Sequence, residues 1–157
     1  MAARAERVSA RRRQRRRRTM TEPSTSAAEV RRLLDRLGGG AEMVNGAVLL
    51  SRDGLVVACS SGLGREDSEH LAALVAGVQG LARGACRRFA GGELMQSVIE
   101  MDTMLVFMVP AGEYAYIAVL AGADADAGTV VFRMFSLAEE LAERPPLIPR
   151  LSGSGTR

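Results

Sequence analysis

The sequence predicts an α/β fold of the α+β type: a five-stranded antiparallel sheet with a long central helix on one face and two terminal helices on the other. Three features of the 157-residue chain favour it. Two apolar runs joined by Asp-Gly predict a hairpin, a long amphipathic helix follows, and three strand-like runs with short turns come next. Because the hairpin runs are apolar on both sides, both faces of the sheet need cover.

The first predicted helix spans residues 27–37. Ser26 is a suitable N-cap, and Glu29 follows three residues later, which is the spacing of a capping box. The apolar side of this helix is formed by Val30, Leu33, Leu34 and Leu37. Three consecutive glycines, residues 38–40, end the helix.

The predicted hairpin covers residues 45–60. Its strands are 45–51 and 55–60, and Arg52-Asp53-Gly54 forms the turn between them. Asp-Gly between two apolar runs is among the strongest short signals for a hairpin. Both strands are too uniformly apolar for a sheet with one wet face, so helices are expected above and below them.

The long helix is predicted over residues 66–89, and the rest of the chain is organised around it. Acidic residues in its first turn and arginines near its far end suit the helix dipole, so these arginines need no phosphate partner. One face is apolar and broad enough to cover a sheet. This predicted leucine face consists of Leu71, Leu74, Val75, Val78, Leu81, Ala82, Ala85 and Phe89.

A stripe of small residues lies on a second face of the long helix, away from the leucine face. It consists of Ala73, Gly77, Gly80 and Gly84, spaced at i, i+4, i+7 and i+11. Each interior glycine costs about 1 kcal/mol relative to alanine, so the three weaken the helix by roughly 3 kcal/mol. We expect a second helix to pack closely on this stripe, which predicts a homodimer. The alternative is that the glycines reflect a Gly/Ala-rich genome and face solvent.

Three strands and a final helix complete the predicted domain. The strands are residues 94–101, 103–109 and 114–121, joined by short turns. In the first of them, Gln96 and Glu100 stand among apolar residues, as expected of a strand with one wetter face. The last helix spans residues 126–144, and Pro145-Pro146 stops it.

The predicted domain covers residues 27–144, between a disordered basic arm, residues 1–26, and a flexible tail, residues 145–157. Residues 1–19 hold nine of the 21 arginines and one of the 18 acids, so the rest of the chain is acidic, with a net charge of −5. Such a run cannot bury enough apolar surface to fold. We expect Met20 to be the true initiator, with residues 1–19 not translated. The alternative is a genuine basic tail that binds phosphate groups of nucleic acid or anionic lipid.

No group of residues in the sequence indicates catalysis, a cofactor or a metal site. The chain has no lysine, which excludes a phosphate-binding Walker A loop. His70, the single histidine, is interpreted as a surface residue of the long helix, and Cys59 and Cys86 as buried free thiols. No apolar run reaches eighteen residues, so no membrane span is predicted. We therefore expect a cytoplasmic protein that is not an enzyme.

The hairpin VNGAVLLSRDGLVVACS, followed by EDSEHLAALVAGVQGLARGACRRF, resembles the Roadblock/LC7 domain family, whose fold is profilin-like. The similarity covers roughly residues 28–143. The short length and the use of Arg without Lys are most similar to actinobacterial members encoded in the clusters called conservons. The resemblance implies a non-catalytic homodimeric scaffold or regulator that binds a small Ras-like GTPase. It also implies an associated sensor kinase as a further partner, with membrane association only through partners.

The resemblance further implies how the dimer forms: the long helices pair, and the third strands extend the sheet across the dimer. With the small-residue stripe, this gives a predicted dimer or partner interface of eight residues: Ala73, Gly77, Gly80, Gly84, Leu94, Gln96, Val98 and Glu100. Two other function classes stay open. One is a small-molecule sensory domain of the PAS or GAF plan, and the other is a nucleic-acid-binding protein that works through residues 1–19.

Overall fold

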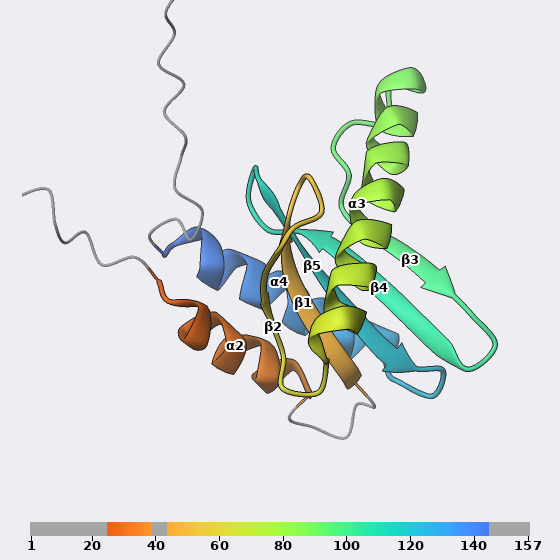
Figure 1. Cartoon of the computed structure of the whole chain (residues 1–157). Helices are drawn as coiled ribbons and strands as arrows, with labels where there is room; N and C mark the ends of the chain where they lie inside the picture. The colour runs from red at the N-terminus through yellow and green to blue at the C-terminus, as the bar shows by residue number, and fades with distance from the viewer. Residues whose placement is uncertain (1–24, 39–43, 145–157) are drawn as a thin grey trace, which may run out of the picture.

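The computed structural model describes residues 25–38 and 44–144, and it has the predicted fold class (Figure 1). Expectations for residues 1–24 and 145–157, including the basic arm and the tail, lie outside the described residues. The elements in chain order are α2 (Ala27–Asp35), the 3₁₀ turn η1 (Arg36–Gly38), β1 (Val44–Ser51), β2 (Val56–Cys59), α3 (Arg65–Arg88), β3 (Ser97–Glu100), β4 (Met104–Pro110), β5 (Ala115–Gly122) and α4 (Ala127–Ala142).

The five strands form one antiparallel sheet in the order β2-β1-β5-β4-β3. Its register is fixed by apolar cross-strand pairs such as Leu49 with Ile117 and Phe107 with Val119. β2 and β3 are the two edges, yet they follow each other in the chain. Because α3 connects these opposite edges, it has to cross the whole sheet.

The face of the sheet under α3 holds one of two hydrophobic clusters. The side chains of β1, β4 and β5 that point to this face alternate with those that point away, as the two-residue period of a strand requires. Leu71, Ala72 and Val75 of α3 pack on them. The buried members are Val48, Leu50, Leu63, Leu71, Ala72, Val75, Val106, Met108, Tyr116 and Ala118.

The opposite face is covered by α2 and α4 (Figure 1). The expectation that both faces of the hairpin are buried is confirmed for β1 but not for its second strand, where only Ala58 of β2 is buried and Leu55 is 65% exposed. Leu34 of α2 and Met134 of α4 are among the most deeply buried side chains. Ser26 caps α2 as predicted: the Glu29 backbone N–H donates to the Ser26 hydroxyl, and the Ser26 N–H donates to the Glu29 carboxylate. These bonds hold the pKa of Glu29 below its usual range.

The predicted leucine face of the long helix is wrong in part. Leu71 and Val75 cover the sheet, but Leu74, Leu81 and Phe89 are exposed, at 49%, 79% and 79%. The buried residues of α3 are Ser68, Leu71, Ala72, Val75 and Gln79, all in its N-terminal two thirds. The reason is length: 24 residues of α-helix span about 36 Å, and the C-terminal part of α3 projects past the strands (Figure 1).

The predicted third strand, residues 94–101, is too long: β3 spans only Ser97–Glu100. In the observed register Ser97 faces Met108, so two residues earlier Met95 would face Pro110. Proline has no backbone N–H and cannot donate to a strand ladder. Leu94 and Gln96 therefore belong to the connection that returns from the end of α3, and of the predicted edge residues only Val98 and Glu100 lie in the strand.

Candidate partner-binding surface

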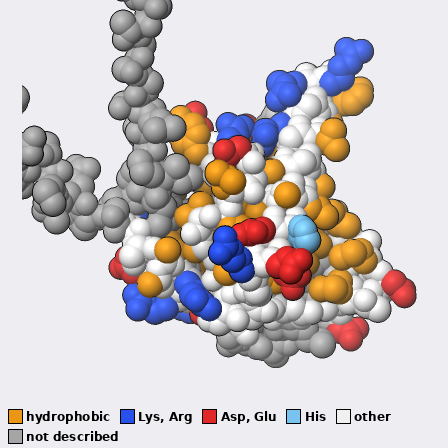
Figure 2. Space-filling view, in the orientation of Figure 1, with side chains coloured by type: hydrophobic (Ala, Val, Ile, Leu, Met, Phe, Trp, Pro, Cys, Tyr) orange, Lys and Arg blue, Asp and Glu red, His pale blue; other side chains and the backbone are white. Residues whose placement is uncertain are grey.

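The C-terminal part of α3 leaves an apolar surface uncovered. Leu74 and Leu81 lie seven residues apart on one side of the helix, and half-buried Val78 lies between them. Other exposed apolar side chains follow along the chain in the return connection and just after β3: Phe89, Met95 and Met101. Figure 2 shows hydrophobic side chains gathered along this flank of the molecule. A run of large exposed apolar groups is typical of a surface that binds a partner rather than of one that faces only water.

The small-residue stripe borders this surface on the outer side of α3. A Cβ built on Gly77 or on Gly80 would meet no atom within 4 Å, and one on Gly84 would reach only Arg87, at 4.0 Å. Ala73 differs, because the β1–β2 turn packs beside it: a Cβ on Gly54 would lie 3.5 Å from the Ala73 Cα. Within one protomer, three of the four stripe residues therefore have open space above them.

The edge of β3 adjoins the same surface. β3 pairs only with β4 among the described strands, so its other side presents backbone donors and acceptors that no strand uses. A partly buried hydrogen bond ties β3 to α3: the Ser97 hydroxyl donates to the Gln79 Oε1 at 2.6 Å, and the Gln79 side chain is fully buried. The position of the sheet edge relative to the helix is thus fixed.

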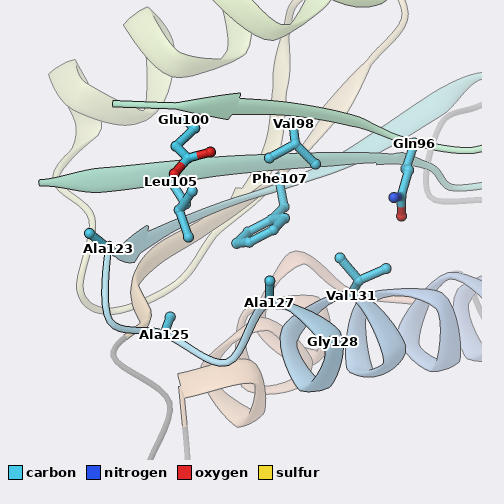
Figure 3. A pocket seen from close by; sticks show the side chains of 10 residues that line it. All are labelled: Gln96, Val98, Glu100, Leu105, Phe107, Ala123, Ala125, Ala127, Gly128 and Val131. Carbon is cyan, nitrogen blue, oxygen red and sulfur yellow. The ribbon is translucent and has the colours of Figure 1, made fainter. Parts of the chain in front are cut away.

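Three of the remaining four predicted interface residues lie on the other face of the sheet. Gln96, Val98 and Glu100 line an open groove of about 470 Å³ between β3, β4 and the start of α4 (Figure 3). Leu105 and Phe107 form its floor, and Val131 forms part of its α4 side. α4 packs against β4, and the groove lies between the start of α4 and the β3 edge. Half-buried Leu94 is not among its lining residues.

The eight residues predicted from the sequence thus fall on two surfaces. Ala73, Gly77, Gly80 and Gly84 lie on the outer side of α3, and three of the others lie on the α4 side of the β3 edge. Sequence reasoning missed the exposed apolar residues, above all Leu81 and Met95, because it assigned Leu81 to the core. The length of the helix could have revealed them, because a 24-residue helix is longer than strands of four to eight residues can cover.

Side chains that could catalyse a reaction or bind a metal ion are sparse in residues 25–38 and 44–144. These residues hold no cluster of His, Cys, Asp or Glu that could bind a metal ion. None of the described helices is both long and apolar enough to cross a membrane. Asp126 stands at the N-cap of α4, where the Thr129 hydroxyl donates to its carboxylate at 2.7 Å and lowers its pKa. The bond from Thr129 gives this acid a structural role at the start of α4.

Comparison with known proteins decides the family. The model of the Roadblock/LC7 domain matches residues 29–121, which is more than half of the chain. The chain belongs to the Roadblock/LC7 family. Roadblock/LC7 domains are in general regulatory or adaptor domains without catalysis of their own. No curated protein matches the chain.

Solved structures agree with this assignment. A Roadblock/LC7 domain from Streptomyces avermitilis is 38% identical, with a TM-score of 0.69 over 71% of this chain and 93% of that one. A second from the same organism is 35% identical, with a TM-score of 0.59 over 71% and 97%. MglB of Myxococcus xanthus is 20% identical, with a TM-score of 0.66 over 72% and 91%, and shows a similarity of fold alone.

Proposed function

We propose that this Roadblock/LC7 protein is a non-catalytic homodimeric scaffold or regulator that binds a small Ras-like GTPase in a bacterial signalling system. The observation that carries the proposal is the uncovered apolar surface of α3 beside the free edge of β3. The step from a dimer to a GTPase partner rests on the family resemblance. Identity of 38% to a Streptomyces Roadblock/LC7 domain supports a bacterial member of that family.

In the proposed dimer, the two β3 strands pair across a twofold axis and the two α3 helices pack on each other above the joined sheet. Such an interface is self-complementary, because the same patch serves both protomers. Open space over Gly77 and Gly80 lets two helix backbones approach closely. The leucines beside the stripe, Leu74 and Leu81, would then be covered by the partner helix, which removes their apolar surface from water.

The small-molecule sensory alternative has one supporting observation, the groove between β3 and α4. Its volume of about 470 Å³ lies in the range of ligand sites. Two features count against it as a sensor site: the groove is open along one side (Figure 3), and Gln96 and Glu100 are its only polar side chains. Ligand pockets normally enclose most of the ligand surface and converge several polar groups on it.

The test compares two exposed apolar residues on opposite sides of the molecule. Leu81→Asp places charge in the proposed dimer surface, and Phe132→Asp, at a residue of α4 that is 71% exposed, is the matched control. Burying one leucine contributes about 1.5–3 kcal/mol. A symmetric dimer loses two, so Leu81→Asp should weaken dimerisation by at least about a hundredfold. Binding of purified small Ras-like GTPases encoded near the gene is then measured by calorimetry with GDP and with a GTP analogue.

We expect the wild type and the Phe132 variant to be dimers in sedimentation and to bind one of these GTPases. The Leu81 variant should be a folded monomer with weakened GTPase binding. A wild-type monomer at tens of micromolar would refute the dimer. A stable dimer that binds none of the GTPases in either nucleotide state would refute the partner.

A further inference from the structure

Three arginines meet at the hairpin end of α3. Arg83 and Arg87 lie one turn apart on the same side of the helix. Arg52 belongs to the β1–β2 turn, which packs on that side: a Cβ on Gly54 would lie 3.2 Å from the Ala76 Cβ. Burial lowers the pKa of Arg83, and the positive charges of Arg52 and Arg87 lower it further. Figure 2 shows blue side chains gathered over this end of the molecule.

None of these three arginines forms an ion pair within residues 25–38 and 44–144. The ion pairs found there join other residues: Arg36 and Arg144 to Glu140, and Arg65 to Glu69. The helix dipole accounts for Arg87 but not for the other two, because its effect is confined to the last turn. Arg83 lies five residues before the helix end, and Arg52 is in a turn. Like charges held together repel each other, so the cluster favours a counter-ion.

Arg83 is held in place without an acid. Its guanidinium carbon lies 5.3 Å from the centre of the Tyr116 ring, a cation–π contact. Tyr116 is 3% exposed and fixed in β5 between Leu50 and Pro110. Three buried polar atoms of this region have no hydrogen-bond partner: Gln79 Nε2, Arg83 Nη1 and the Tyr116 hydroxyl. The guanidinium is thus partly desolvated and preorganised while its charge is unmatched, and buried charges in folded proteins are normally paired.

We propose that Arg83, Arg52 and Arg87 form a binding site for an oxyanion, a phosphate or carboxylate group. The guanidinium of Arg83 binds the anion through its outward edge, in the fork geometry that matches two oxygens of one anion. The ring of Tyr116 holds the inward face of the guanidinium. Arg52 supplies positive charge from the β1–β2 turn. Arg87 supplies it from the helical turn that follows Arg83. Arg87 borders the small-residue stripe, since a Cβ on Gly84 would lie 4.0 Å from its Nη2, whereas Arg83 and Arg52 lie on the hairpin side of α3. The site does not depend on the proposed GTPase.

The test uses the full chain and a residue-specific signal. Residues 1–19 carry nine arginines that bind the same anions, so a bulk measurement would combine both regions. The Nε–Hε cross-peaks of Arg52, Arg83 and Arg87 are followed by NMR during titration with inorganic phosphate or with an acetylated tetraglutamate peptide. Sodium chloride at matched ionic strength controls for screening. Arg88→Met is the matched variant, since Arg88 lies on the same helix end but faces another side.

We expect saturable shifts of the three cross-peaks in the wild type and in the Arg88 variant. In Arg83→Met, which keeps the stem over Tyr116, the apparent Kd reported by Arg52 and Arg87 should rise at least about tenfold. Arg52→Met, in an exposed turn, gives the same test with Arg83 as the reporter and covers the case in which the Arg83 variant does not fold. Tighter binding of the peptide identifies a carboxylate of a protein, and tighter binding of phosphate identifies a phosphate group. Shifts equal to those with chloride, or a Kd unchanged in Arg52→Met, would overturn the site.

Discussion

Replacing Gly77 and Gly80 by leucine tests whether the small-residue stripe packs against a second helix or faces solvent. In the single chain the change is sterically free, because a Cβ at either position meets no atom within 4 Å. Leucine is also the better helix former, by about 1 kcal/mol per site relative to glycine. An isolated protomer should therefore gain about 2 kcal/mol of unfolding free energy. A chain in which the glycines face only solvent should show this gain and nothing else.

In a dimer that packs α3 on α3, the same leucines oppose association. Each protomer brings two, so four bulky side chains enter one interface. At an overpacking cost of about 1–3 kcal/mol per site, the interface loses roughly 4–12 kcal/mol. A dimer with a micromolar Kd is held by about 8 kcal/mol. The loss is therefore of the same order as the whole association energy, and the variant should be monomeric at tens of micromolar.

Size-exclusion chromatography with light scattering, paired with urea denaturation, measures both effects on one sample. Gly77→Ala with Gly80→Ala is the matched control: it gains nearly the same helix propensity but adds only one methyl group per site. We expect the alanine pair to remain dimeric and the leucine pair to be a folded monomer. A leucine pair that is more stable and keeps the wild-type mass would show that the glycines contact only solvent and would refute the close-packed interface.

Three further predictions concern stability. Ser97→Ala removes the only hydrogen bond to the fully buried Gln79 side chain found in the described structure, so the free energy of unfolding in urea should fall by about 1–3 kcal/mol, while Ser97→Thr, which keeps the hydroxyl, should lose less. Ser26→Ala removes the cap of α2 and should cost about 1 kcal/mol. The pKa of Glu29 is lowered in the folded chain, so its contribution should be complete above the ordinary value of 4.5 and lost as the pH falls through the folded-state pKa. Thermal melts from pH 7 to pH 3 should show a smaller acid-induced loss for Glu29→Gln than for the wild type.

The elements of the fold could be predicted because their signals are local. Asp53-Gly54 marked the hairpin turn, and Gly54 adopts the positive φ of 88° that such a turn requires. Ser26 and Glu29 marked the start of α2, and the structure shows the full capping box. The spacing of apolar residues in the first helix placed Val30, Leu33, Leu34 and Leu37 on its apolar side, and all four are buried. Each of these features depends on neighbours within a few residues.

The candidate site could be predicted only in part. The glycine spacing of α3 gave the stripe, since helical period alone places Gly77, Gly80 and Gly84 on one side. The spacing of the leucines in α3 wrongly placed Leu81 in the core. The same spacing occurs in a helix face that is buried on a sheet and in one that is left for a partner. Leu94 and Gln96 were placed in a strand that begins only at Ser97, because the pairing with Pro110 is a long-range contact.

The sequence by itself determined the order and type of the elements, the cap of α2, the turn of the hairpin and the similarity to the Roadblock/LC7 family. Tertiary structure decided which apolar side chains are covered, where β3 begins and which charges meet. The physical reason is that propensity, capping and periodicity act within one or two turns of chain. Burial and charge pairing depend on elements far apart in sequence, as when the turn at Arg52 reaches Arg83 of α3.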